Sequence, residues 1–154
     1  MYLKTFLLFF AALSMSNISC NQASNEISTE LSIDGTWSLL SGTTITKGES
    51  VVTDYTKDQQ MIKIINKTHF AFLRHDLNHG KGQSPDFEAG GGTYTLKGDQ
   101  YTEHLDYCNS REWEGKSFSF TVSIHKDTLI QKGIEKVEAA GVDREIIERY
   151  VKVK

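Results

Sequence analysis

Residues 117–125 read Ser-Phe-Ser-Phe-Thr-Val-Ser-Ile-His, a strict alternation of polar and apolar side chains. Successive side chains of a β-strand point to opposite faces, so the four apolar side chains share one face and the polar ones share the other. This pattern predicts a strand that is buried on one side. Lys126 and Asp127 then form a turn before a second apolar segment, residues 128–132, which predicts a hairpin.

The same kind of short segment recurs on both sides of this hairpin, separated by Gly, Asp, Asn and Lys. The predicted strands cover residues 35–41, 60–65, 68–76, 92–96, 100–107, 117–125, 128–132 and 148–153. Lys97-Gly98-Asp99 joins two of them with a glycine at the tip, as in a tight β-hairpin. About eight antiparallel strands close a small up-and-down barrel with room for side chains or one small ligand. We therefore expect an all-β barrel, with a sandwich as the structural alternative.

Two regions depart from the strand pattern. Residues 135–140 and 143–147 have helical composition, which predicts one or two helical turns before the last strand. Residues 77–91 form the longest irregular stretch and contain the single proline of the chain. A loop of this length is either a flexible lip over a cavity mouth or a solvated connection without a role, and both interpretations stay open.

The composition describes a mildly acidic chain that is long enough for one domain. Its 154 residues carry 17 Lys and Arg against 20 Asp and Glu, a formal charge of −3, so no excess of positive charge favours nucleic acid. The two cysteines, Cys20 and Cys108, are separated by a predicted flexible segment, and we expect no disulfide between them. We expect a monomer.

The N-terminal residues have the organisation of a secretory signal that ends on a cysteine. Lys4 precedes the apolar run 6–13, which is too short to span a bilayer, and Ile18-Ser19-Cys20 follows. This ending predicts a bacterial lipoprotein with lipid on Cys20; secretion without lipidation is the alternative, because Asn17 replaces the usual aliphatic residue. We expect a signal peptide over residues 1–19, the lipidated cysteine and a flexible tether over 20–32, and a barrel over 33–154.

Two parts of the chain resemble the lipocalins and other calycins. Gly35-Thr36-Trp37 resembles their Gly-x-Trp motif, and Arg149 resembles the basic residue that packs over that tryptophan. A second resemblance, to uncharacterised lipocalin-like lipoproteins of the Gram-negative envelope, is carried by Thr68-His69-Phe70, Gly90-Gly91-Gly92-Thr93-Tyr94-Thr95-Leu96, Gly98-Asp99 and Tyr101-Thr102-Glu103-His104. The resemblance implies a barrel closed at one end by a cation–π contact between Trp37 and Arg149, worth about 0.5–2 kcal/mol. It also implies a lipid-anchored protein of the cell envelope, at the outer membrane, and it supplies no ligand or reaction.

Strand parity predicts which side chains of residues 100–107 face the interior. Tyr101, Glu103, Leu105 and Tyr107 share the more apolar face, which we expect to point inward. A buried carboxylate such as Glu103 must be paired, hydrogen-bonded or protonated. Glu103 is therefore an acceptor for a ligand, a general acid or base, or a structural partner of a barrel arginine or tyrosine hydroxyl.

The predicted ligand site combines aromatic side chains with two charged groups. Its residues are Phe70, Phe72, Arg74, Tyr94, Tyr101 and Glu103. Arg74 is either an inward partner for an anion or a residue at the strand end that reaches solvent. The expected function is non-catalytic binding of a small apolar or amphipathic molecule inside the barrel, without a cofactor. The alternatives are an isomerase or lyase that uses Glu103, and a structural or interaction lipoprotein with a filled barrel.

Other classes of site receive no support from the sequence. His69 and His75 would lie about 20 Å apart on an extended strand, too far to share a metal. His75, Asp76 and His79 are closer, but they fall at a strand end and lack the glutamate of a zinc signature. The chain contains no Walker loop, dinucleotide-binding loop or Gly-x-Ser-x-Gly elbow.

Overall fold

A computed structural model describes residues 31–81 and 86–154 of the chain. These residues form nine β-strands and two short 3-10 turns. The strands are β1 (Gly35–Thr46), β2 (Glu49–Asp54), β3 (Gln59–Ile65), β4 (His69–Asp76), β5 (Phe87–Lys97), β6 (Gln100–Cys108), β7 (Lys116–His125), β8 (Thr128–Val137) and β9 (Val142–Lys152), and the turns are η1 (Arg111–Trp113) and η2 (Glu138–Ala140). The predicted signal peptide, residues 1–19, and Cys20, the predicted site of lipid attachment, lie outside the described residues.

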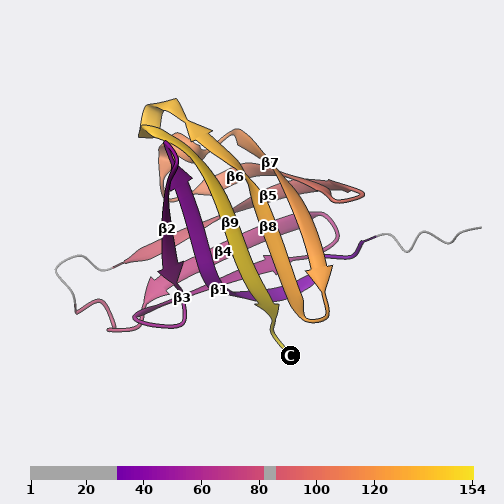
Figure 1. Cartoon of the computed structure of the whole chain (residues 1–154), viewed down its shortest axis with the longest axis horizontal. Helices are drawn as coiled ribbons and strands as arrows, with labels where there is room; N and C mark the ends of the chain where they lie inside the picture. The colour runs from indigo at the N-terminus through magenta and orange to yellow at the C-terminus, as the bar shows by residue number, and fades with distance from the viewer. Residues whose placement is uncertain (1–30, 82–85) are drawn as a thin grey trace, which may run out of the picture.

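The strands form one antiparallel sheet that closes into a barrel. The hydrogen-bonded order is β2-β1-β3-β4-β5-β6-β7-β8-β9, and β1 also pairs with β9. Figure 1 shows β1 and β9 side by side, where the first and last strands of the wall meet. Eight strands therefore make the closed wall, and β2 is attached to β1 beside it. The predicted all-β barrel of about eight strands is confirmed.

Strand β1 changes its partner along its length. Its first part pairs with β3, starting with Gly35 opposite Ile65, and its second part pairs with β2. The sequence did not predict β2, whose side chains are almost all exposed. Val51 and Val52 are neighbours, so they point to opposite faces, and they are 63% and 69% exposed. A strand that buries neither face leaves no alternation of polar and apolar residues in the sequence.

The segment before the last strand is a long hairpin with a tight end. β8 and β9 pair along their length, and only Glu138–Ala140 turns as a 3-10 helix, which Gly141 ends with a φ of 66°. The short helical turn before the last strand is confirmed. The rest of the segment predicted as helical, residues 135–137 and 143–147, is strand, because pairing across the hairpin overrides a weak local propensity.

A bulge in β6 changes which side chains face the interior. Between Leu105 and Tyr107 the pairing with β5 slips by one residue, so Asp106 has no opposite partner of its own. Tyr107 is consequently 73% exposed, against the inward prediction, and Cys108 takes the inward position. The two backbones approach so closely here that a Cβ on Gly92 would overlap the carbonyl oxygen of His104 in β6.

The irregular connection between β4 and β5 is shorter than predicted. Residues 87–91 belong to β5, so the connection covers residues 77–86, of which 82–85 lie outside the described part. The carboxylate of Asp76 accepts hydrogen bonds from the backbone N–H groups of Gly80 at 2.8 Å and Asp86 at 3.0 Å. One side chain thereby holds both ends of the connection together.

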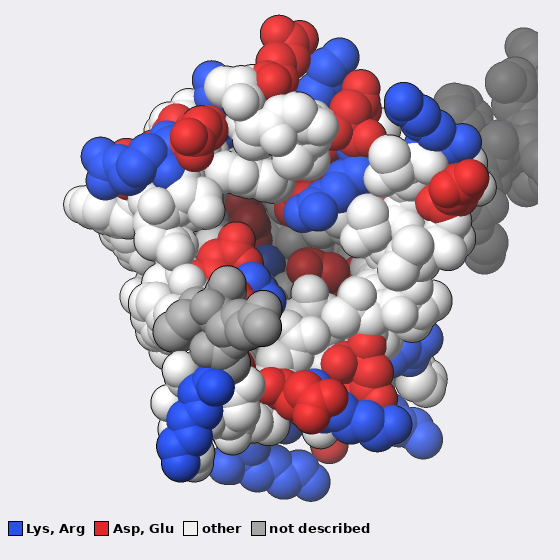
Figure 2. Space-filling view, turned by 90° about the vertical axis from the view of Figure 1, so that its left-hand side faces the viewer, with Lys and Arg blue, Asp and Glu red and all other residues white. Residues whose placement is uncertain are grey.

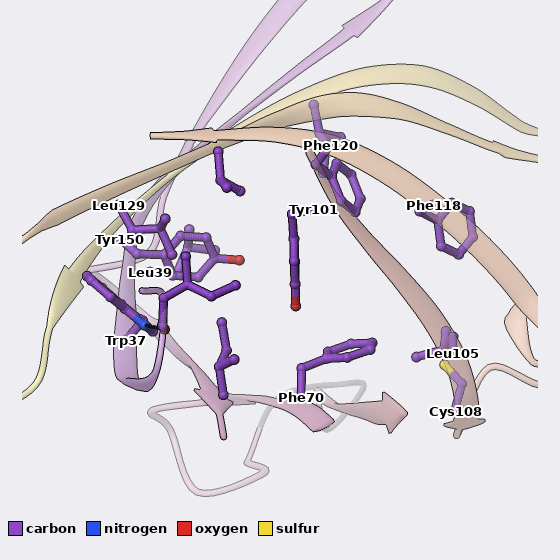
Figure 3. Packing of buried hydrophobic residues seen from close by; sticks show 14 of the residues in the cluster. Trp37, Leu39, Phe70, Tyr101, Leu105, Cys108, Phe118, Phe120, Leu129 and Tyr150 are labelled. Atoms are coloured by element: carbon purple, nitrogen blue, oxygen red, sulfur yellow. Dashed lines mark hydrogen bonds between the residues drawn. The ribbon is translucent and has the colours of Figure 1, made fainter. Parts of the chain in front are cut away.

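Apolar side chains fill the barrel unevenly. One group gathers where β1, β8 and β9 meet and consists of Ile33, Trp37, Leu39, Leu129 and Tyr150. Figure 3 shows Trp37, Leu39, Leu129 and Tyr150 on one side of the interior and a second group, Leu105, Cys108 and Phe118, on the other. Among the described residues, no helix has the length and apolar character required to cross a membrane.

Candidate functional site

A tryptophan closes one end of the barrel. Trp37 is 1% exposed, and its indole N–H donates a hydrogen bond to the Ile33 carbonyl at 2.8 Å. The ammonium of Lys152 lies over the ring, 5.2 Å from its centroid, whereas Arg149 is exposed. The expected cation is therefore replaced by Lys152, because the register of β1 and β9 places Lys152 directly opposite Trp37.

The barrel interior also contains a cavity of about 130 Å³. Figure 2 shows a hollow in one face of the molecule, with acidic and basic side chains at its rim and inside it. The lining has an apolar part, formed by Tyr55, Met61, Phe72, Leu105, Cys108, Trp113, Phe118 and Phe120. It has a polar part, formed by Lys63, Arg74, Glu88, Glu103, Gln131, Glu135, Arg144 and Glu148. A cavity of this size suits a molecule as large as benzene, which an apolar cavity of about 150 Å³ accepts.

A buried lysine forms the floor of the cavity. Lys63 is 3% exposed and donates hydrogen bonds to Glu103 Oε1 at 2.7 Å and to Gln131 Oε1 at 3.0 Å. Three ring centroids lie 5.4–5.9 Å from its ammonium, those of Phe70, Tyr101 and Tyr150. Burial lowers the pKa of Lys63, but the charges of Glu103 and Glu148 outweigh this effect and raise it. Lys63 is therefore a cation at neutral pH and not a nucleophilic amine.

Within residues 31–81 and 86–154, the buried hydroxyl of Tyr101 has no hydrogen-bond partner of good geometry. Tyr101 is 1% exposed, its ring packs against Tyr94 at 5.2 Å, and Figure 3 shows its hydroxyl directed into the middle of the barrel. Burial and the negative charge of Glu103 raise its pKa, so the hydroxyl stays protonated. Leaving a buried polar group unpaired costs about 1–3 kcal/mol, so the interior contains an unused donor.

Two arginines in the cavity wall are already paired. Arg144 contacts Glu135 at 2.7 Å. Arg74 contacts Glu88 at 3.0 Å and also Asp86, so it lies in the wall and binds acidic side chains of β5 and the preceding connection. Both guanidinium groups therefore have carboxylate partners before any ligand enters.

Glu148 is different from the other acidic groups of the cavity. Within residues 31–81 and 86–154 it forms no salt bridge with a lysine or arginine, and its Oε2 accepts a hydrogen bond from the Tyr150 hydroxyl at 2.7 Å. Burial raises the pKa of Glu148, although the charge of Lys63 and the Tyr150 hydrogen bond oppose the shift. Glu148 also lines a neighbouring pocket of about 80 Å³, together with Tyr55 and Arg144.

The structure brings together only half of the predicted ligand residues. Those that line the cavity are Phe72, Arg74 and Glu103. Phe70 and Tyr101 are core residues beside the floor. Tyr94 lines a separate polar pocket, where its hydroxyl donates to the Asn66 carbonyl at 2.8 Å.

Six polar residues of the cavity were not identified from the sequence, namely Lys63, Glu88, Gln131, Glu135, Arg144 and Glu148. A signal was present on two strands. In β3, Lys63 has the same parity as Met61 and Ile65, and in β9, Glu148 has the same parity as Tyr150. A charged residue on the apolar face of a strand indicates an interior group, but it does not indicate its partner.

Metal binding has no cluster to support it in the described part of the chain. No three His, Cys, Asp or Glu side chains lie together there in a way that could hold a metal ion.

Comparison with known proteins identifies no family and no function for this chain. No family model matches the chain, and no curated protein matches it. Among solved structures, an uncharacterised protein from Bacteroides eggerthii is similar, with 15% sequence identity and a TM-score of 0.44 over 78% of this chain and 98% of that chain. Similarity at this level carries no conclusion about function, so the lipocalin resemblance stays a prediction.

Proposed function

We propose that this protein binds a small, partly apolar molecule in the barrel cavity. The observation that carries the proposal is the uneven interior, which is packed around Trp37 but contains a cavity of about 130 Å³ between Lys63 and the two arginines. Aromatic walls with a few polar groups are the usual composition of a small-molecule site. The volume favours a ligand with one ring or a short chain over a large lipid.

The two tryptophans provide the test, because only one of them lines the cavity. Trp113 is in the cavity wall, and Trp37 is buried at the closed end. A ligand should change the fluorescence of the wild type and of Trp37→Phe, and should leave Trp113→Phe unchanged. The first probes are benzylamine, benzyl alcohol and benzoate, followed by native mass spectrometry of protein purified from its own membranes. Absence of a fluorescence change with every probe, together with no retained molecule, contradicts the proposal.

The proposal includes a lipid anchor on Cys20, which would hold a monomeric, lipocalin-like barrel at the outer membrane. Its support is the signal sequence that ends in Ile18-Ser19-Cys20 and the polar residues that follow. Incorporation of labelled palmitate should be lost in Cys20→Ala and retained in Cys108→Ala. Equal labelling of Cys20→Ala and the wild type would refute the anchor.

Catalysis by Glu103 is the second candidate, because Glu103 lines the cavity beside another ionisable group. Its ion pair with Lys63 argues for a structural role, since the buried ammonium already engages the carboxylate. A molecule retained by the purified protein should therefore keep its NMR spectrum during prolonged incubation. Conversion that Glu103→Gln abolishes would favour an enzyme instead.

A further inference from the structure

The charges that line the cavity are not balanced. Three basic side chains, Lys63, Arg74 and Arg144, face four acidic ones, Glu88, Glu103, Glu135 and Glu148. Each basic group has its own carboxylate, at 2.7 Å for Lys63 and Glu103, 2.7 Å for Arg144 and Glu135, and 3.0 Å for Arg74 and Glu88. The remaining carboxyl group belongs to Glu148.

Glu148 has the surroundings of an unused acceptor. Its only hydrogen bond from another side chain in the described residues comes from the Tyr150 hydroxyl, and it lines both the main cavity and the adjacent pocket. Lys63 is the basic group that acts on it electrostatically, but that ammonium already binds Glu103 and Gln131. A further positive charge entering the cavity therefore meets Glu148 without breaking an existing ion pair.

The walls around this acceptor also suit a cation. Tyr55, Phe72 and Phe118 line the cavity. Trp113 also lines it and packs against Phe118 with ring centroids 5.4 Å apart, but the Arg144 guanidinium already lies 5.8 Å from the centroid of the Trp113 ring. Aromatic faces attract ammonium groups by about 0.5–2 kcal/mol and also bury the apolar part of a ligand. An anion would have to compete with Glu103, Glu135 or Glu88 for a cation that is already paired.

We infer that the cavity takes a small organic cation, a monoamine with a single ring or a short apolar chain, whose ammonium pairs with Glu148. This inference rests on the proposed binding function and names the class of its ligand.

Three probes of similar shape but different charge test whether the cavity prefers a cation. Benzylamine, benzyl alcohol and benzoate are titrated into the wild type at pH 7.5 by calorimetry or Trp113 fluorescence. Benzylamine should bind about tenfold or more tightly than the other two, since it alone forms the buried ion pair. Glu148→Gln keeps the shape and the acceptor for Tyr150, and should lower benzylamine affinity about tenfold or more. Asp143→Asn, an exposed carboxylate on the same strand, is the matched control and should bind normally.

The outcomes separate the ligand class from the binding function. Tighter binding of benzyl alcohol or benzoate than of benzylamine overturns the inference and leaves pocket binding intact. Unchanged benzylamine affinity in a folded Glu148→Gln, verified by circular dichroism, also overturns it. Absence of binding by all three probes overturns the inference, and the search for a retained molecule then decides the function. The comparison of probes in the wild type does not depend on whether the variant folds.

Binding of the amine should release a proton from Glu148. Burial raises the pKa of Glu148, so its carboxyl group retains a proton to higher pH than an ordinary glutamate, and a bound ammonium displaces that proton. Benzylamine affinity should therefore rise with pH in the wild type and less in Glu148→Gln; equal slopes contradict the pairing. The other ionisable groups around the cavity, present in both proteins, are Tyr55, Lys63, Arg74, Glu88, Glu103, Cys108, Glu135, Arg144 and Tyr150.

Discussion

The packed end and the cavity of the barrel are built by the same strands but bury different kinds of side chain. On β9, Tyr150 is fully buried beside Trp37, whereas Glu148 lies two residues away in the cavity wall. On β6, Tyr101 belongs to the core and Glu103 lines the cavity two residues later. Side chains two residues apart on a strand point to the same face, so the same alternation places residues both in the packed end and in the cavity wall. The free energy of unfolding should therefore depend most on the packed end around Trp37 and on the buried ion pair of Lys63, and ligand binding on the other side chains that line the cavity.

The largest expected effect on stability comes from Lys63, the buried lysine at the floor of the cavity. Lys63→Met leaves Glu103 buried without its partner and should lower the free energy of unfolding by about 3–5 kcal/mol. The double variant with Glu103→Leu should recover most of this loss, because apolar residues of similar volume replace a buried pair at little cost. Urea denaturation measures both, with the exposed Lys67→Met as the control. No additional recovery in the double variant would mean that the pair stabilises the fold through interactions beyond charge neutralisation.

Substitution of each tryptophan compares the contribution of the packed end to stability with that of the cavity wall. Trp37→Phe removes buried volume and the hydrogen bond to Ile33, and should cost about 2 kcal/mol. Trp113→Phe, at a partly buried position in the cavity wall, should cost less than about 1 kcal/mol and abolish the fluorescence response to ligands. Thermal unfolding measures the stability loss of each variant. Equal losses would contradict the proposed difference between the packed end and the cavity.

A third prediction concerns the pH dependence of the cavity end. Because the folded pKa of Glu148 is raised, its protonated form stabilises the fold, fully below the ordinary value of 4.5 and progressively less as pH rises through the folded pKa. The wild type should therefore lose more stability than Glu148→Gln between pH 4.5 and pH 8. Burial also raises the pKa of Glu135, but that group is present in both proteins, so the difference between melting curves reports Glu148. A larger loss of stability in Glu148→Gln than in the wild type would contradict this prediction.

The smallest effect distinguishes Lys152 from Arg149 at the closed end. Lys152→Met removes the cation over Trp37 and should cost about 0.5–1 kcal/mol, as expected for an exposed cation–π contact. Arg149→Met should have no measurable effect, because Arg149 is exposed and the cation over Trp37 is Lys152. The reverse order in urea denaturation would restore the original expectation for Arg149.

The strand pattern made much of the fold predictable. The alternation in residues 117–125, the Lys97-Gly98-Asp99 turn and the inward position of Glu103 all follow from local periodicity, and all appear in the structure. The failures occur where periodicity is absent or interrupted. β2 buries neither face, and the bulge at Asp106 turns Tyr107 outward.

The candidate site was less predictable because its members come from distant strands. The alternation placed Glu103 inside, but its partner Lys63 is 40 residues away and Gln131 joins them from β8. Which cation meets which carboxylate depends on strand register and barrel closure, and a shift of one residue reverses the face of every side chain. The sequence therefore determined the barrel, all of its strands except β2, and the inward carboxylate. The fold decided the ion pairs, the choice of Lys152 over Trp37 and the isolation of Glu148, since these depend on contacts across the closed wall.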